Sequence, residues 1–154
     1  MGIVQAQIRH VREDDLPQLV RLCAEHAAYE DSEFHENGQK ARLSSAFFGS
    51  RPVLYGWVVE AEPQLAGFMT ATIDYATWPA EFFLHMDCLY LNEQFRGQGL
   101  GRRLINELKQ FARSRQINLI QWQTPSQNQA GIRFYERIGA RSRDKKRYFL
   151  DVES

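Results

Sequence analysis

Residues 82–112 place a glycine-rich turn between an apolar segment and a strongly periodic one. Phe82 to Leu91 has the length and apolar character of a buried strand. Gly97, Gly99 and Gly101 follow at alternate positions, and leucines then recur at helical spacing. Such a turn leaves backbone N–H groups uncovered at the positive end of the helix dipole, where anions bind. This order of strand, turn and helix predicts an α/β fold with a site for a phosphate-bearing ligand, and it favours a diphosphate.

Two common phosphate-binding motifs do not match this turn. A nucleotide P-loop requires Lys followed by Ser or Thr after its glycines, and neither pair is present here. A dinucleotide fingerprint has the spacing G-x-G-x-x-G, whereas this turn has G-x-G-x-G. Arg96, Arg102 and Arg103 add positive charge to it. Taken alone, the turn is equally well read as a helix start with glycines for close packing.

Hydrophobic periodicity predicts secondary structure along the whole chain. Strands are expected at residues 4–11, 53–61, 65–75, 82–91, 119–123 and 147–151. Helices are expected at residues 16–27, 39–48, 100–112 and 126–138. Strands grouped early and alternation with helices later indicate a mixed, mostly antiparallel sheet with helices on both faces. We expect residues 1–154 to form a single domain.

Charge and cysteine usage narrow the classes of partner. The 19 basic and 19 acidic residues cancel, which argues against a nucleic-acid or membrane partner, since these usually require a surface of one sign. Cys23 and Cys88 lack metal-type spacing, and we expect both to be reduced and buried. No metal site is predicted. The start of the chain has no signal-peptide pattern, so we expect a cytoplasmic protein.

Two segments carry a family resemblance. Arg96-x-x-Gly99-x-Gly101 resembles the first signature of the GNAT acyltransferase superfamily. Residues 128–140, which begin with Asn128 and include Phe134-Tyr135, resemble the second signature, one helix and one strand later. The resemblance extends from Ile8 to about Val152 and implies the GNAT fold, whose sheet is splayed at a central cleft. It also implies acetyl transfer from acetyl-coenzyme A (acetyl-CoA) to an amine, by a homodimer.

The resemblance assigns roles at the cofactor. In that family the glycine turn binds the diphosphate, and pantetheine lies along the edge of the preceding strand. A backbone N–H near Leu89 would polarise the thioester carbonyl, and Tyr135 would protonate the leaving thiolate. On composition alone, Tyr135 is instead a packing aromatic and Asn128 a helix cap. The expected cofactor-binding residues are Leu89, Tyr90, Leu91, Arg96, Gly97, Gln98, Gly99, Leu100, Gly101, Arg102, Asn128 and Tyr135.

Within the superfamily the chain resembles the diamine and thialysine acetyltransferases at three places. These are residues 28–30, residues 74–78 and residues 86–89, where Asp87 replaces a glutamate of those enzymes. Carboxylates would attract a substrate ammonium group and accept its proton, and aromatic faces would line the channel. The expected substrate-binding residues are Tyr29, Glu30, Trp78 and Asp87, with Asp87 and Tyr135 catalytic. Otherwise Glu30 belongs to a solvated acidic loop, and Asp87 pairs with an arginine.

These features predict an acetyl-CoA-dependent N-acetyltransferase acting on a small-molecule amine, either a polyamine or a lysine-like diamine. The amine would attack the thioester directly, without a covalent enzyme intermediate. Three alternatives stay open at this point: acetylation of an aminoglycoside or another antibiotic, acetylation of a protein amine, and a non-catalytic coenzyme A-binding module.

Overall fold

The computed structural model describes residues 5–153, which divide into two compact units between Gln123 and Thr124. The first unit contains the glycine turn and all five strands, and the second contains one helix. The expectation of a single domain over residues 1–154 stays a prediction.

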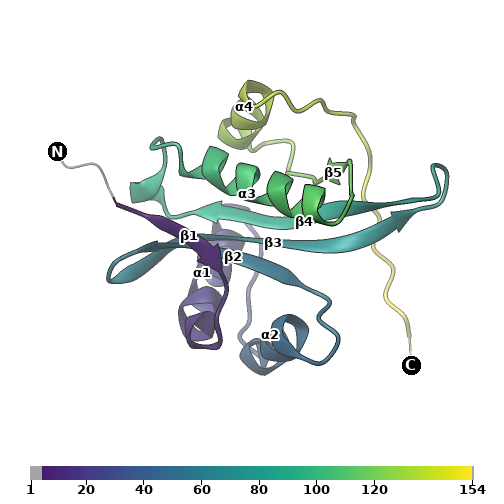
Figure 1. Ribbon diagram of the computed structural model, residues 1–154. Helices are drawn as coiled ribbons and strands as arrows, with labels where there is room; N and C mark the ends of the chain where they lie inside the picture. Colours follow the sequence, from purple (N-terminus) through teal and green to yellow (C-terminus); the bar gives the residue numbers. More distant parts are fainter. Residues whose placement is uncertain (1–4, 154) are drawn as a thin grey trace. The chain divides into compact units, whose positions relative to one another are not determined.

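The first unit is built on one sheet with the strand order β1-β2-β3-β4-β5 (Figure 1). Neighbours pair antiparallel except β4 and β5, which are parallel. This arrangement confirms the mixed, mostly antiparallel sheet. The strands are β1 (Gln7–His10), β2 (Tyr55–Ala61), β3 (Gln64–Ala76), β4 (Glu81–Leu91) and β5 (Ile120–Gln121). Val4, in the first expected strand, lies outside the described residues.

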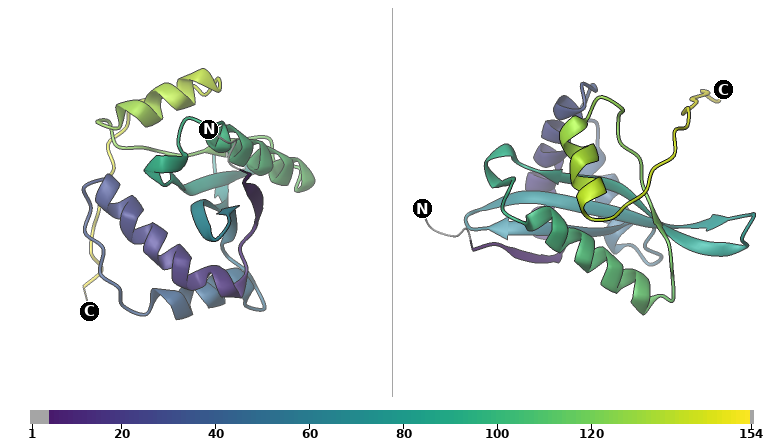
Figure 2. Two further views of the ribbon diagram at one scale, coloured as in Figure 1. Left: turned by 90° about the vertical axis from the view of Figure 1, so that its left-hand side faces the viewer. Right: turned by 90° about the horizontal axis from the view of Figure 1, so that it is seen from above.

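Helices cover both faces of this sheet, as predicted. The helices α1 (Leu16–Tyr29) and α2 (Gln39–Phe48) lie on one face, and α3 (Leu100–Ser114) lies on the other (Figures 1 and 2). Pro17 stands in the first turn of α1, where its fixed φ suits the helix and its missing N–H costs nothing. The bounds of α2 agree with those expected from its periodicity.

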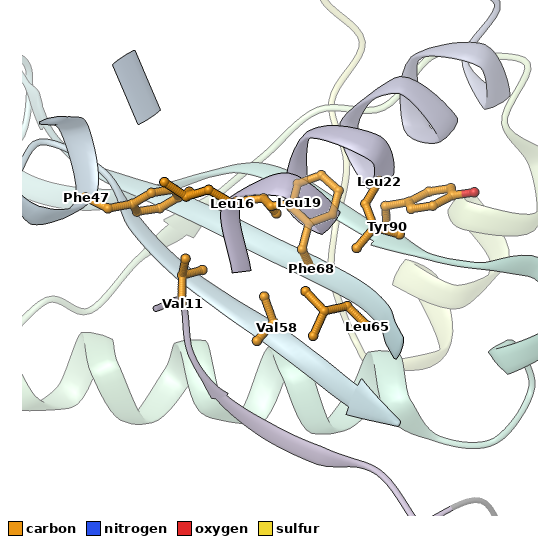
Figure 3. Close-up of a cluster of buried hydrophobic side chains, with 9 residues drawn as sticks. All are labelled: Val11, Leu16, Leu19, Leu22, Phe47, Val58, Leu65, Phe68 and Tyr90. Atoms are coloured by element: carbon orange, nitrogen blue, oxygen red, sulfur yellow. The ribbon is translucent and has the colours of Figure 1, made fainter. Parts of the chain in front are cut away.

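A hydrophobic cluster fixes α1 and α2 against the sheet. Leu19 and Leu22 of α1 face Phe68 of β3 and Tyr90 of β4 (Figure 3). Burial of each such side chain stabilises the fold by about 1.5–3 kcal/mol. The cluster consists of Val11, Leu16, Leu19, Leu22, Phe47, Val58, Leu65, Phe68 and Tyr90. It therefore holds the last turns of α1 beside the end of β4, where the sequence predicts the site.

The second unit contains helix α4 (Gln129–Arg137), which is shorter at both ends than the expected helix over residues 126–138. The prediction of a strand at residues 147–151 was wrong, because this segment has no regular secondary structure. Its residues suit a strand, but β propensity expresses fit to neighbouring strands rather than an intrinsic backbone preference. Tyr148 and Leu150 are instead 85% and 94% exposed.

Candidate active site

The strands β4 and β5 pair over only two residues. The pairs are Leu84 with Ile120 and His85 with Gln121. Beyond His85, this edge of β4 pairs with no strand in the described part of the chain, while its other edge pairs with β3 as far as Leu91. The unpaired edge lies where the fold is expected to splay, and it includes the Leu89–Leu91 segment predicted to bind pantetheine.

Asp87 occupies a β-bulge beside this divergence. Thr70 of β3 pairs with Cys88 and Ala71 pairs with Met86, so Asp87 has no opposing residue. A bulge of this kind redirects a side chain and often lies next to an active site. The Asp87 side chain is 60% exposed, with a carboxylate oxygen 3.8 Å from Nε2 of His85. The strand therefore presents a largely exposed carboxylate just beyond the last pair between β4 and β5.

The thiols of Cys23 and Cys88 lie close enough to Asp87 for its charge to raise their pKa values. Burial raises the pKa of Cys23 to about 11 and that of Cys88 to about 12, and the Asp87 carboxylate adds to both shifts. Sγ of Cys88 donates to Oδ2 of Asp87 at 3.6 Å. Both cysteines are free but half-buried rather than buried as expected, because they pack at the margin of the hydrophobic cluster. With such pKa values neither thiol is an effective nucleophile at neutral pH.

The glycine turn leaves the start of α3 without a side-chain cap. Gly97 has φ of 75° and Gly99, the N-cap residue, has φ of 81°, both in the left-handed region that favours glycine. Gly99 has no side chain that could accept a hydrogen bond as the cap of α3. The first N–H groups of a helix have no partner within it. These groups and the helix dipole give this helix end the character that attracts anions, and the binding of a diphosphate here stays a prediction.

The expected substrate residues on α1 and the expected cofactor residues around β4 meet in one network. The guanidinium carbon of Arg96 lies 4.6 Å from the ring centroid of Tyr29 and 5.6 Å from that of Tyr90. A carboxylate oxygen of Glu30 lies 2.7 Å from Nε2 of His26, whose ring stacks on Tyr90 at 5.2 Å. Tyr29, Glu30, Tyr90 and Arg96 thus belong to connected parts of the first unit.

His26 was not among the residues predicted from sequence. Its signal is the spacing of four between His26 and Glu30, which places both on one face of a helix. That spacing is common on helices, so by itself it does not distinguish His26 from other helical histidines.

Trp78 lies in the turn of the β3–β4 hairpin and is 98% exposed. Beside this turn, the rings of Tyr75 and Phe82 pack edge to face at 4.9 Å. The channel role expected of Trp78 stays a prediction.

Asn128 and Tyr135 belong to the second unit. Oδ1 of Asn128 accepts from the N–H of Gly131 at 3.2 Å, and Nδ2 donates to Oγ1 of Thr124 at 2.9 Å. Asn128 is therefore a helix cap, the role that its residue type alone favours. Tyr135 is half-buried on α4, with its ring 5.5 Å from that of Phe134. The roles of both residues toward the cofactor stay predictions.

Residues 5–153 contain no group of three or more His, Cys, Asp or Glu side chains arranged to hold a metal ion. Over the same residues, no helix combines the length and apolar character needed to span a membrane.

Comparisons with known proteins agree with these features. Human spermidine/spermine N(1)-acetyltransferase-like protein 1 is 29% identical over 141 residues, which cover 87% of this chain but only 20% of that protein. Thialysine N-epsilon-acetyltransferase of Caenorhabditis elegans is 26% identical over 130 residues, covering 79% of this chain and 81% of that protein. The solved structure of AAC(6′)-Iy with the bisubstrate analog CoA-S-monomethyl-acetylneamine has a TM-score of 0.80 at 14% identity, covering 96% and 99% of the two chains. Residues 9–140 match the model of the acetyltransferase (GNAT) family. The chain therefore belongs to the acetyltransferase (GNAT) family of acyltransferase enzymes.

Proposed function

We propose that this protein transfers the acetyl group of acetyl-CoA to an amine of a polyamine or a lysine-like diamine. The observation that carries the proposal is the unpaired edge of β4 followed, after the short 3-10 helix η2 (Glu93–Phe95), by the uncapped glycine turn of α3. Coenzyme A has amide groups along pantetheine and a diphosphate further along the molecule. A strand edge offers partners to the amides, and a helix N-terminus attracts the diphosphate.

Each proposed step uses a group of this chain. When bound, acetyl-CoA supplies the thioester that is cleaved. The backbone N–H near Leu89 polarises the thioester carbonyl, and Asp87 accepts the proton of the substrate ammonium through water. Tyr135 donates its phenolic proton to the sulfur that leaves. We further propose a cytoplasmic homodimer with no nucleic-acid or membrane partner.

The cysteine pKa values support direct attack by the amine. A covalent route through cysteine would require a thiolate to take the acetyl group before the amine does. Burial and the nearby Asp87 charge raise the pKa of Cys88 to about 12, so this residue is almost entirely protonated at neutral pH. Cys23 is similar, with a pKa of about 11. Neither residue beside Asp87 therefore favours an acyl-enzyme step.

Charge and likeness to relatives both favour a cationic substrate. Asp87 offers an exposed carboxylate, and Glu30 a second one at the end of α1. Tyr29, 43% exposed, supplies an aromatic face of the kind that attracts cations. Relatives at 29% and 26% identity are named for spermidine/spermine and thialysine.

A panel of amines with a thiol-release assay tests the proposal. Spermidine, spermine, thialysine and aminoglycosides are compared at equal concentration with acetyl-CoA. We expect free thiol above the no-amine rate with the polyamines or thialysine. A preference for aminoglycosides would overturn the substrate class. Binding of coenzyme A without thiol release from any amine would favour the non-catalytic module.

Replacement of Gly99 by valine is expected to raise the dissociation constant of acetyl-CoA at least tenfold. An added Cβ meets no protein atom within 4 Å at this position, so the chain itself has room for it. The side chain would instead obstruct a diphosphate approaching the backbone N–H groups. Isothermal titration calorimetry measures the affinity, with circular dichroism as the check on folding.

Gly139→Val is the matched control for this experiment. Gly139 has φ of 89°, and a Cβ there also meets no protein atom within 4 Å. Both variants therefore carry strain at a positive φ, but only Gly99 lies in the proposed diphosphate site. If folded Gly99→Val bound acetyl-CoA as tightly as folded Gly139→Val, the glycine turn would not be part of the cofactor site.

Replacement of Asp87 by asparagine is expected to lower kcat/KM for diamines at least tenfold and to leave acetyl-CoA binding nearly unchanged. The change preserves shape and removes charge. Raised salt should reduce diamine turnover by the wild type more than by the variant, because only the wild type has that charge to screen. Asp14→Asn, an exposed carboxylate on η1 (Glu13–Asp15), serves as the control. Equal diamine activity and salt sensitivity in Asp87→Asn and wild type would make Asp87 a structural residue.

A further inference from the structure

The side chain of Arg96 joins three separate segments of the first unit. Arg96 directly follows the 3-10 helix η2 (Glu93–Phe95) and directly precedes the glycine turn. Its Nε donates to the carbonyl oxygen of Leu91 at 2.8 Å. Its guanidinium carbon lies 4.6 Å from the ring centroid of Tyr29, the last residue of α1. One side chain therefore links a helix end, a strand end and the proposed diphosphate turn.

Two further contacts connect the end of β4 to α1. The hydroxyl of Tyr90 donates to the carboxylate of Glu25 on α1 at 3.4 Å, and Nδ2 of Asn92 donates to the same oxygen at 3.1 Å. Beneath them, Leu22 and Tyr90 belong to the hydrophobic cluster (Figure 3). A shift of the last turn of α1 would consequently disturb the end of β4 as well.

The contacts of Arg96 depend on its shape as well as its charge. A guanidinium group is planar, so it can donate in its own plane and present its face to an aromatic ring. Arg96 makes the hydrogen bond to Leu91 while its guanidinium carbon lies over the ring of Tyr29, an arrangement that such a planar group permits. A lysine ammonium would preserve the positive charge but could not reproduce this arrangement.

We propose that Arg96 is a positioning residue that couples the glycine turn to the end of α1 through Tyr29. The inference rests on the proposed function, because it assigns coenzyme A to the turn and the amine to the region of Tyr29 and Glu30. Any such coupling is reciprocal: coenzyme A at the turn tightens amine binding by the factor by which the amine tightens coenzyme A binding. Arg96 thereby acts on the amine site without touching the amine.

A double-mutant cycle with coenzyme A as the probe tests this coupling. Tyr29→Leu removes the ring, Tyr29→Phe retains it, and Arg96→Lys retains the charge. Although Tyr29 lies outside the proposed cofactor site, Tyr29→Leu is expected to weaken coenzyme A binding about fivefold. Tyr29→Phe should remain within about twofold of wild type, because phenylalanine offers the same face. Adding Tyr29→Leu to Arg96→Lys should cause no further loss.

Arg115 and Tyr55 provide a matched control away from the turn. The guanidinium carbon of Arg115 lies 5.4 Å from the ring centroid of Tyr55, at the other end of α3. Arg115→Lys and Tyr55→Leu remove the same kind of contact. They are expected to lower the melting temperature without changing coenzyme A affinity, so they separate loss of stability from loss of positioning.

The possible results lead to different conclusions. Additive losses for Tyr29→Leu and Arg96→Lys would show that the two residues act independently, and would overturn the coupling while leaving the proposed function intact. Absence of coenzyme A binding in the wild type would overturn the proposed function and the coupling together. If Tyr29→Leu does not fold, Tyr29→Met replaces it in the cycle: unchanged coenzyme A affinity in that folded variant overturns the coupling, and a loss of about fivefold that is absent from the Arg96→Lys background supports it.

Discussion

Replacement of Tyr135 by phenylalanine is expected to lower turnover with the best amine by about 10²–10⁴-fold, while acetyl-CoA affinity changes little. The substitution removes one oxygen and preserves the ring, so packing beside Phe134 is retained. If Tyr135 is the general acid, the leaving thiolate then lacks its proton donor. Steady-state turnover is measured by thiol release, and affinity by calorimetry.

Tyr148→Phe is the control for this substitution. Tyr148 is 85% exposed in the second unit and has no assigned role, so loss of its hydroxyl should leave turnover unchanged. Should Tyr135→Phe also remain within about threefold of wild type, Tyr135 is a packing residue and the proton comes from another group. The acetyltransferase proposal would survive that result, because the strand edge and the glycine turn carry it.

Replacement of Arg9 by methionine is expected to lower the free energy of unfolding by about 3 kcal/mol at neutral pH. The Arg9 guanidinium donates to both carboxylate oxygens of Asp15, at 2.7 and 2.9 Å, and to Glu60 at 2.8 Å. Asp15 is only 5% exposed, so removal of Arg9 leaves a buried carboxylate without its cation. Urea denaturation measures the loss, and the double variant Arg9→Met/Asp15→Asn should recover part of it because no buried charge remains.

The loss caused by Arg9→Met is expected to shrink in acid. Burial favours a higher pKa for Asp15, but the hydrogen bonds from Arg9 and from the N–H of Arg12 outweigh it, so the pKa is lowered. A carboxyl with a lowered folded-state pKa stabilises the fold above its unfolded pKa of about 4, and loses this contribution as the pH falls through its folded pKa. The difference between wild type and variant should therefore decrease below about pH 4. A difference that is constant from pH 7 to pH 3 would contradict a role for the Asp15 charge.

Local features of this protein were accessible from sequence because neighbouring residues determine them. The periodicity of residues 39–48 predicted α2 with its observed bounds. The order of strand, glycine turn and helix was likewise predicted, and Gly97 and Gly99 have the positive φ values that favour glycine. The order of strands and helices also indicated the mixed sheet, because hydrophobic spacing distinguishes a strand from a helix over a few residues.

Contacts between distant segments were decided by the tertiary structure. The bulge at Asp87 arises from its register against β3, and the short pairing of β5 opens the edge of β4. The contact of Arg96 with Tyr29 joins residues far apart in the sequence. The segment 147–151 has the residues of a strand and forms none. Strand pairing, register and side-chain contacts are properties of two segments brought together, whereas local sequence describes one segment at a time.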